Sequence, residues 1–201
     1  MAKEIAIYPG KVRAGKDWKV FKAKHNGKLI VTIKQAGEGD GMAKAVRNSP
    51  VSMQYLKGES EVSLFVEVVV EGGKIHAPHF KKVLGKHGWE TAKKPPGKSG
   101  YKMVLKVRAD KLGDTFVSDL KSTSGSAVHY HSVRTSISKY SYDLSAALYL
   151  DLFSLVVEGM EDFIWIFASK ENPVAKAWKA SSKQKLVGRS KWSKAVLKIA
   201  D

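Results

Sequence analysis

The sequence predicts an α+β protein, with an antiparallel sheet to about residue 134, a packed helical region at about 140–170 and a basic C-terminal segment. Apolar and polar residues alternate with a period of two in several early stretches, as in strands with one buried face. The period then changes, and a long apolar run follows. We therefore expect one α+β domain over residues 1–173 and a partly helical segment over 174–201.

The N-terminal part is expected to open with a short strand and a hairpin. Ile5 and Ile7 alternate with other residues before a Tyr-Pro-Gly turn, and two runs at 18–24 and 28–35 flank His-Asn-Gly. Asn-Gly between alternating runs favours a hairpin, because both residues tolerate positive φ. The glycine-rich stretch at 37–41 is expected to form a mobile loop. Its position resembles that of a phosphate-binding loop, but its two acids would repel a phosphate.

Two stretches give the clearest strands. In 61–70 every second residue is Val or Leu, and in 101–108 Met, Leu and Val alternate with Lys and Arg. The second stretch should place Lys102, Lys106 and Arg108 in a row on the outer face of a sheet. Further strands are expected at 115–120 and 128–133, separated by a Ser- and Gly-rich turn.

The later part of the chain is expected to be helical. Residues 142–168 are apolar on nearly all sides, which is typical of a buried helix, and Gly159 is a point where it could divide. Four carboxylates within this stretch argue against a membrane span, and it could also contact a second copy as a homo-oligomer interface. Ser190 could cap a last helix with Trp192 on its apolar face.

Charge restricts the function more than hydrophobicity does. The net charge is +16, the hydrophobic fraction is an ordinary 43%, and there is no cysteine, which excludes disulfides and thiolate chemistry. Ten basic and two acidic residues lie in 71–108, and nine basic and two acidic residues lie in 170–201, whereas 109–169 holds four basic and eight acidic residues. This clustering favours a nucleic-acid partner over a merely soluble surface.

The stretch 76–102 combines lysines with single aromatic residues and contains one acid, Glu90. Lysines contact phosphates as flexible point charges, and aromatic rings can stack on unpaired bases. Trp89 could equally be a core residue. The residues expected to bind nucleic acid are Lys81, Lys82, Lys86, Trp89, Lys93, Lys94, Lys98, Tyr101, Lys102, Lys106, Arg108, Lys183, Lys185, Arg189, Lys191 and Lys194.

Catalytic and metal motifs carry less weight. A zinc site at His76, His79 and His87 is disfavoured, because the neighbouring lysines repel a cation. His129-Tyr130-His131 resembles the His-hydrophobic-His strand of HUH endonucleases, which implies a metal on the histidines and attack by a downstream tyrosine, here Tyr140, Tyr142 or Tyr149. Such a short motif recurs by chance, so two outward histidines on a strand are preferred. No carboxylate pair is singled out, and no cofactor is expected.

The sequence thus favours a non-enzymatic protein that binds single-stranded RNA or DNA with little sequence specificity. One alternative is a viral or phage coat or genome-packaging protein, in which basic segments face the genome. A further alternative is an HUH-like single-strand endonuclease. The first residues contain no long apolar run of a secretion signal, and a cytoplasmic or nucleoid-associated location is expected.

Overall fold

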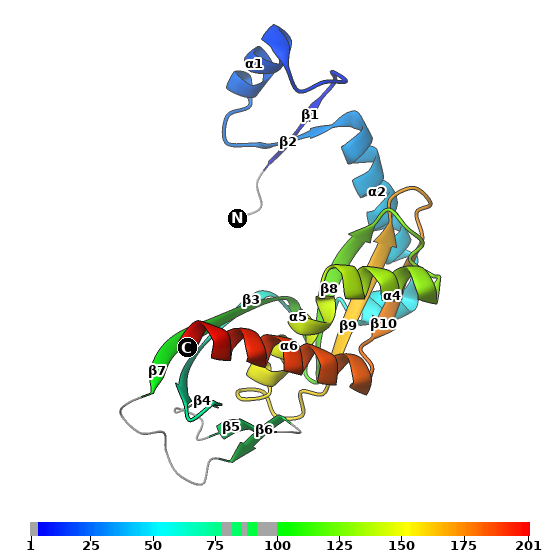
Figure 1. Cartoon of the computed structure of the whole chain (residues 1–201). Helices are drawn as coiled ribbons and strands as arrows, with labels where there is room; N and C mark the ends of the chain where they lie inside the picture. Colours follow the sequence, from blue (N-terminus) through cyan, green and yellow to red (C-terminus); the bar gives the residue numbers. More distant parts are fainter. Residues whose placement is uncertain (1–3, 78–81, 86–87, 92–99) are drawn as a thin grey trace.

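A mixed eight-stranded sheet forms the centre of the protein, and helices lie on both of its faces (Figure 1). The structure is a computed structural model that describes residues 4–77, 82–85, 88–91 and 100–201, and the α+β class is confirmed. The strands of this sheet, in spatial order, are β10 (Ala175–Lys179), β9 (Asp162–Ser169), β8 (Phe116–Thr123), β7 (Tyr101–Leu112), β3 (Glu59–Glu71), β4 (Lys74–Ala77), β5 (Lys82–Gly85) and β6 (Gly88–Thr91). A separate two-stranded sheet contains β1 (Ile5–Tyr8) and β2 (Leu29–Thr32). The helices of the described residues are α1 (Gly15–Lys24), α2 (Ile33–Arg47), α3 (Pro50–Gln54), α4 (Tyr130–Lys139), α5 (Tyr142–Phe153) and α6 (Ser182–Ala200).

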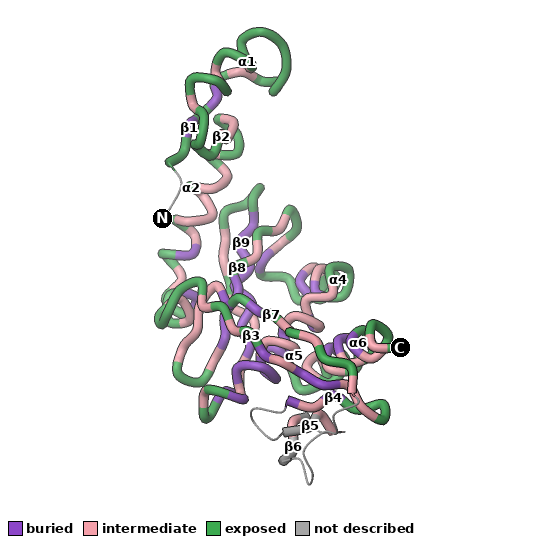
Figure 2. The backbone as a smooth tube through the Cα atoms, turned by 90° about the vertical axis from the view of Figure 1, so that its left-hand side faces the viewer, coloured by how far each residue is buried: buried purple, intermediate pink, exposed green. Residues whose placement is uncertain are grey.

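The N-terminal unit differs from the expected hairpin. β1 and β2 pair in parallel and are joined by α1, so the strand predicted at 18–24 is wrong. Gly27, with φ of +82°, lies in the turn after this helix, and a residue of positive φ ends a helix as readily as it makes a hairpin. This unit projects from the rest of the chain and is largely exposed (Figures 1 and 2).

The stretch 37–41 is helical rather than the predicted loop. It lies inside α2, which begins with a capping box between Thr32 and Gln35. Near its end Val46 is buried against Ile164 and Ile166 of β9. Three glycines lower the helix propensity of this stretch. The packing of Val46 on β9 and the capping box therefore stabilise the helix.

The two clearest predicted strands are confirmed. β3 and β7 pair antiparallel over most of their lengths. Val66 and Val107 are buried on the inner face, while Phe65 is 60% exposed on the outer face. Lys102, Lys106 and Arg108 are also exposed, as the alternation predicted.

The predicted helix at 142–168 is only half correct. α5 is helical, but the second half forms the strand β9, which pairs in parallel with β8 and antiparallel with β10. Seven of its eight residues, Phe163 to Ser169, are buried, because helices cover the sheet on both faces at this position. The strand predicted at 128–133 is also wrong, since α4 begins at Tyr130 and forms part of the crossover from β8 to β9.

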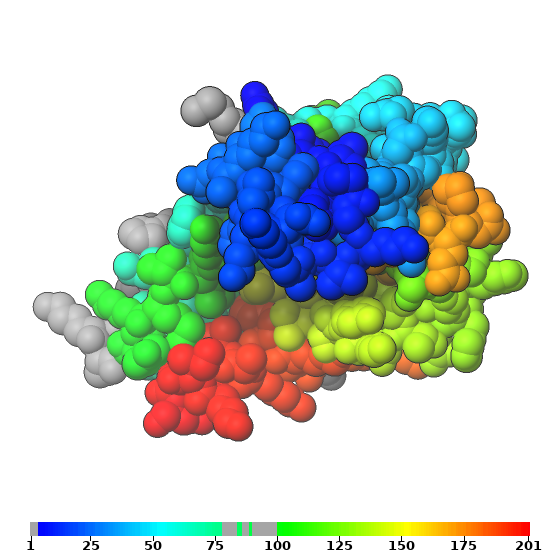
Figure 3. Space-filling model, turned by 90° about the horizontal axis from the view of Figure 1, so that it is seen from above, coloured from blue at the N-terminus to red at the C-terminus, as the bar shows by residue number. Residues whose placement is uncertain are grey.

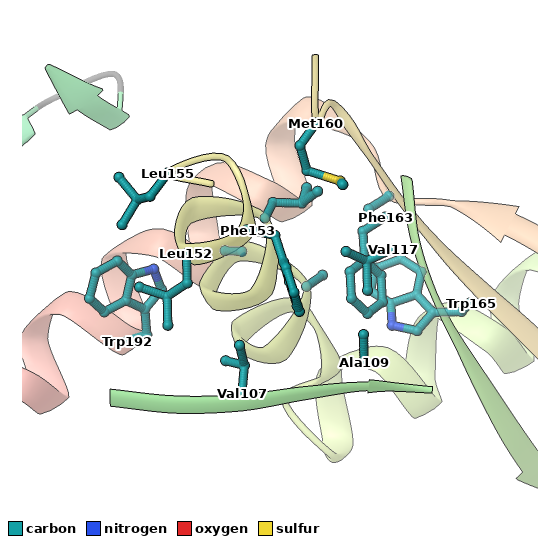
Figure 4. Packing of buried hydrophobic residues seen from close by; sticks show 14 of the residues in the cluster. Val107, Ala109, Val117, Leu152, Phe153, Leu155, Met160, Phe163, Trp165 and Trp192 are labelled. Atoms are coloured by element: carbon teal, nitrogen blue, oxygen red, sulfur yellow. The ribbon is translucent and has the colours of Figure 1, made fainter. Parts of the chain in front are cut away.

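The C-terminal segment belongs to the packed body. α6 begins at Ser182, eight residues before the expected cap, with a capping box between Ser181 and Gln184. Trp192 is almost fully buried beside Leu152 and Phe153 of α5, within the core that Figure 4 shows between these helices and the sheet. α5 buries Ala146, Ala147, Leu150, Leu152 and Phe153 inside the chain, and a homo-oligomer contact through 142–168 stays a prediction. None of the helices in the described ranges is long and apolar enough to cross a membrane.

Candidate active site

A hairpin of β7 and β8 brings two aspartates together. The strands pair at Leu112 with Val117 and at Lys111 with Ser118, so Asp110 and Asp119 come next in the same register. The backbone N–H of Leu120 donates a hydrogen bond of 3.0 Å to Oδ2 of Asp110. The carboxylate of Asp110 therefore takes the place of a strand carbonyl at this point and is held beside β8.

Asp119 is buried and close to a cation. Its residue is 8% exposed, and its Oδ2 lies 2.6 Å from Nζ of Lys121. Burial raises the pKa of Asp119 to about 6. The charge of Lys121 opposes the rise, whereas a hydrogen bond with Asp110 and the charge of Asp110 add to it. Two neighbouring carboxyl groups cannot both ionise without cost, and the ammonium of Lys121 offsets part of that cost at Asp119.

Lys121 connects this pair to an aromatic group. Residues 119 and 121 are two apart on a strand and therefore lie on the same face. The ammonium of Lys121 lies 4.9 Å from the ring centroid of Tyr142, at the start of α5. The Tyr142 ring stacks with that of Tyr140 at 5.5 Å between centroids. We call Asp110, Asp119 and Lys121 the acid–lysine site.

A cavity of about 620 Å³ opens beside the acid–lysine site. It lies at the C-terminal ends of β8 and β9, and Tyr142 is part of its wall. His131, Lys139 and Lys170 also line it. Ligands in sheets with parallel strands commonly bind at the carboxyl ends of those strands, which is where this cavity lies.

The row of cations predicted on the outer face of β7 is exposed to solvent. Lys106 lies over the ring of Phe65, with Nζ 5.1 Å from the centroid, and Arg108 pairs with Glu61 at 3.1 Å. Tyr101 is 49% exposed at the start of the same strand. Lys102, exposed next to it, points to the opposite face of the strand, so Phe65 rather than Tyr101 shares the outer face with the cations.

The cations predicted on α6 are divided between internal pairs and solvent. Arg189 pairs with the buried Asp151, and Lys191 donates at 2.8 Å to both carboxylate oxygens of Asp143. Nζ of Lys185 donates to the carbonyl of Glu161 at 3.1 Å. These three cations help to hold α6 in place. Lys183 and Lys194 are exposed.

The other residues predicted to bind nucleic acid lie in the stretch between β4 and β7. Lys81, Lys86, Lys93, Lys94 and Lys98 lie outside the described residues, and Lys82 is the first residue of β5. Trp89 of β6 packs on the main core, with its ring 6.3 Å from that of Trp192.

The histidine motif has a different geometry from the strand it resembles. His129 is the N-cap of α4, and Tyr130 and His131 are the first residues of the helix. Within the described ranges, no group of three or more His, Cys, Asp or Glu side chains could hold a metal. A metal at the acid–lysine site would thus have two carboxylates as its protein side-chain ligands there.

The acid–lysine site was missed from the sequence. The signal was Asp119-Leu120-Lys121 at the end of the strand predicted at 115–120, preceded by Asp110 across a short turn that contains Gly113. A hairpin of that length places the two acids opposite each other. The many lysines elsewhere in the chain give a stronger signal, which points to phosphate binding and not to a carboxylate site.

The fold of this chain is similar to that of a solved structure. No protein-family model matches the chain, and no curated protein matches it. A crystal structure from Eubacterium rectale, named "Putative exonuclease", superimposes with a TM-score of 0.54 at 13% sequence identity. The match covers 91% of this chain and 60% of that one. A second structure, named SSO0001, gives a TM-score of 0.35 at 14% identity, with 82% and 69% of the two chains covered.

Proposed function

We propose that this protein is a metal-dependent nuclease that hydrolyses phosphodiester bonds at the acid–lysine site. The observation that carries the proposal is the pairing of Asp119, buried and with its pKa raised to about 6, with Asp110 at one side and Lys121 at the other. Lys121 pairs with Asp119, and a divalent cation between the two aspartates would neutralise both carboxylates at neutral pH.

The donor set fits Mg²⁺ or Mn²⁺. Both are hard ions that prefer carboxylate oxygens, and Mg²⁺ is commonly held by one or two carboxylates together with the phosphates of a substrate. When bound, such an ion polarises a phosphoryl oxygen and lowers the pKa of a water molecule. Asp110 and Asp119 would fix the position of the ion relative to the strand ends.

Lys121 would act on the reacting phosphate. Its ammonium is held between Asp119 and the Tyr142 ring, so it is oriented before substrate binds. With the cation on the carboxylates, the ammonium is free to donate to the phosphate oxygen on which negative charge increases during attack. A preoriented cation of this kind stabilises the transition state more than the ground state.

The charge of the whole chain agrees with a nucleic-acid substrate. A net charge of +16 attracts a polyanion, and the outer face of β7 offers Lys102, Lys106 and Arg108 for phosphate contacts. The neighbour from Eubacterium rectale bears a name in keeping with this activity, but the three side chains carry the argument. Such a substrate accords with a cytoplasmic or nucleoid-associated location.

Cleavage assays test the proposal. The wild type should cut labelled DNA or RNA with Mg²⁺ or Mn²⁺, and EDTA should abolish the cutting. Asp110→Asn, Asp119→Asn and Lys121→Ala should each reduce the rate by about 10²-fold or more, because the first two remove a carboxylate ligand of the metal ion and the third removes the cation at the reacting phosphate. Asp114→Asn is the matched control, since it makes the same change in the turn of the same hairpin.

A non-enzymatic binding protein is the second candidate, and the exposed row on β7 with Phe65 favours it. The same assay separates the two. Tight binding of oligonucleotides with no metal-dependent cleavage, and with Asp119→Asn indistinguishable from the wild type, would support the binding protein and reject the nuclease.

A further inference from the structure

The cavity beside the acid–lysine site has a lining suited to phosphates. Six Ser and Thr side chains offer hydroxyl groups for hydrogen bonds, and His131, Lys139 and Lys170 supply cationic or potentially cationic groups. Among the described residues that line it, none is acidic. Phosphate oxygens accept hydrogen bonds from hydroxyls and lysines, so this lining favours a chain of phosphates over a cation or an apolar ligand.

The segments that form the cavity wall pack closely and are joined by hydrogen bonds. The loop after β8 turns at Gly125, where a Cβ atom would lie 2.6 Å from Oγ of Ser132 on α4. The N–H of Gly125 donates to Oγ1 of Thr123 at 3.1 Å, and the N–H of Lys170 donates to the carbonyl of Thr123 at 2.9 Å. The loop, α4 and the end of β9 are therefore tied together. Seen from above, the orange chain that follows β9 lies beside yellow-green residues of the segment that contains α4 and α5 (Figure 3).

Two stacked tyrosines form one side. Tyr140 is 57% exposed, and its ring lies parallel to that of Tyr142 within 29°. Ser141 between them has a φ of +51°, a conformation that costs a residue with a side chain energy and is typical of functional sites. Lys139 lies 5.3 Å from the ring centroid of Tyr140. An exposed ring next to a lysine is the combination that binds an unpaired base and its phosphate.

Tyr142 links the cavity to the acid–lysine site. Tyr142 lines the cavity, and the ammonium of Lys121 lies 4.9 Å from the centroid of its ring. A strand whose backbone follows the cavity would thus pass one ring away from the lysine that we place at the scissile phosphate. A duplex offers no unpaired base to Tyr140, whereas a single strand does.

We propose that this cavity binds a single strand of nucleic acid next to the cleavage point, with Lys139 and Lys170 on its phosphates and Tyr140 against a base. The inference rests on the proposed nuclease activity for its purpose. Its binding test is independent of that activity.

The test measures binding without cleavage. Fluorescence anisotropy with a labelled single-stranded oligonucleotide and a blunt duplex of the same length, in EDTA, gives both affinities over a range of salt concentrations. The double substitution Lys139→Ala with Lys170→Ala should weaken single-strand binding about 10- to 100-fold and flatten the slope of log K against log salt by about 1.4, or 0.7 per phosphate contact. Tyr140→Ala should weaken single-strand binding about 5- to 150-fold. Both should change duplex binding less than about twofold.

The matched control is Lys183→Ala with Lys194→Ala, which removes two exposed lysines from α6. It should have a much smaller effect on single-strand binding than the cavity pair. Equal losses for the control and the cavity pair, equal losses on single strand and duplex, or no loss would each overturn the proposal. If the wild type fails to cleave but this pattern holds, the nuclease is rejected and the strand-binding cavity stands. If it cleaves and the pattern is absent, the cavity proposal alone fails.

Discussion

At the scale of single residues, Asp119 is a buried carboxyl group with a perturbed pKa. In the folded protein burial raises its pKa to about 6, while the unfolded chain releases the proton near 3.9. Between these values the native state binds more protons than the unfolded state. The contribution of Asp119 to stability is therefore present at low pH and lost as pH rises through about 4 to 6.

Asp119→Asn should consequently stabilise the metal-free protein at pH 8, by about 1–3 kcal/mol, and change its stability little at pH 4. Urea unfolding at the two pH values measures this. Asp114→Asn should have no effect at either pH. A variant less stable than the wild type at pH 8 would show that the ionised carboxylate is well compensated in the metal-free state.

Trp89 is the second informative residue. The sequence left open whether it stacks on bases or belongs to the core, and the structure packs it beside Trp192. Trp89→Ala should cost about 3 kcal/mol in stability, whereas Tyr101→Ala, at an exposed position, should stay within about 0.5 kcal/mol. Thermal melts would decide. A Trp89 variant with wild-type stability and weaker single-strand binding would return this residue to the nucleic-acid surface.

At the scale of elements, the success of sequence reasoning depends on how many faces an element buries. β3 and β7 were predicted because one face is buried and the other exposed, which gives a period of two. β9 was mistaken for helix because both of its faces are buried, so its run of apolar residues has no period. α2 was missed because its glycines oppose a helix that the sheet and the cap stabilise.

Some contacts of the candidate functional residues could be predicted from local sequence, and others depend on tertiary packing. Asp110 and Asp119 are close in sequence, so a local hairpin would have predicted their contact. The pairing of Arg189 with Asp151 and of Lys191 with Asp143 depends on the packing of α6 against α5, and a count of lysines cannot reveal it.

The close contact of α6 and α5 gives a test at this scale. A Cβ atom at Gly188 would lie 1.9 Å from the carbonyl oxygen of Asp143, so Gly188→Ala must separate the helices. We expect a loss of stability of about 2 kcal/mol or more, because overpacking forces backbone shifts. Gly39→Ala in α2 is the control, since nothing lies within 4 Å of the added atom and alanine favours the helix by about 1 kcal/mol. Equal effects at the two positions in chemical denaturation would contradict the described packing.

At the scale of the whole molecule, positive charge should govern binding. If the protein neutralises about six phosphates of a single strand, log K should fall with log salt at a slope near −4. Removing Lys102, Lys106 and Arg108 together should flatten this slope by about 2. Anisotropy titrations in EDTA over several salt concentrations would measure both slopes. A slope near zero for the wild type would reject the electrostatic account.

The central claim is that Asp110 and Asp119 hold one divalent cation between them, and Mn²⁺ binding tests it most directly. Calorimetry at pH 8 should show Mn²⁺ binding to the wild type and to Asp114→Asn, and an affinity lower by at least about tenfold in Asp110→Asn and in Asp119→Asn. Because Mn²⁺ competes with the proton that Asp119 binds, the wild-type affinity should fall as pH drops below about 6. No Mn²⁺ binding to the wild type, or equal binding to all four proteins, would contradict the claim.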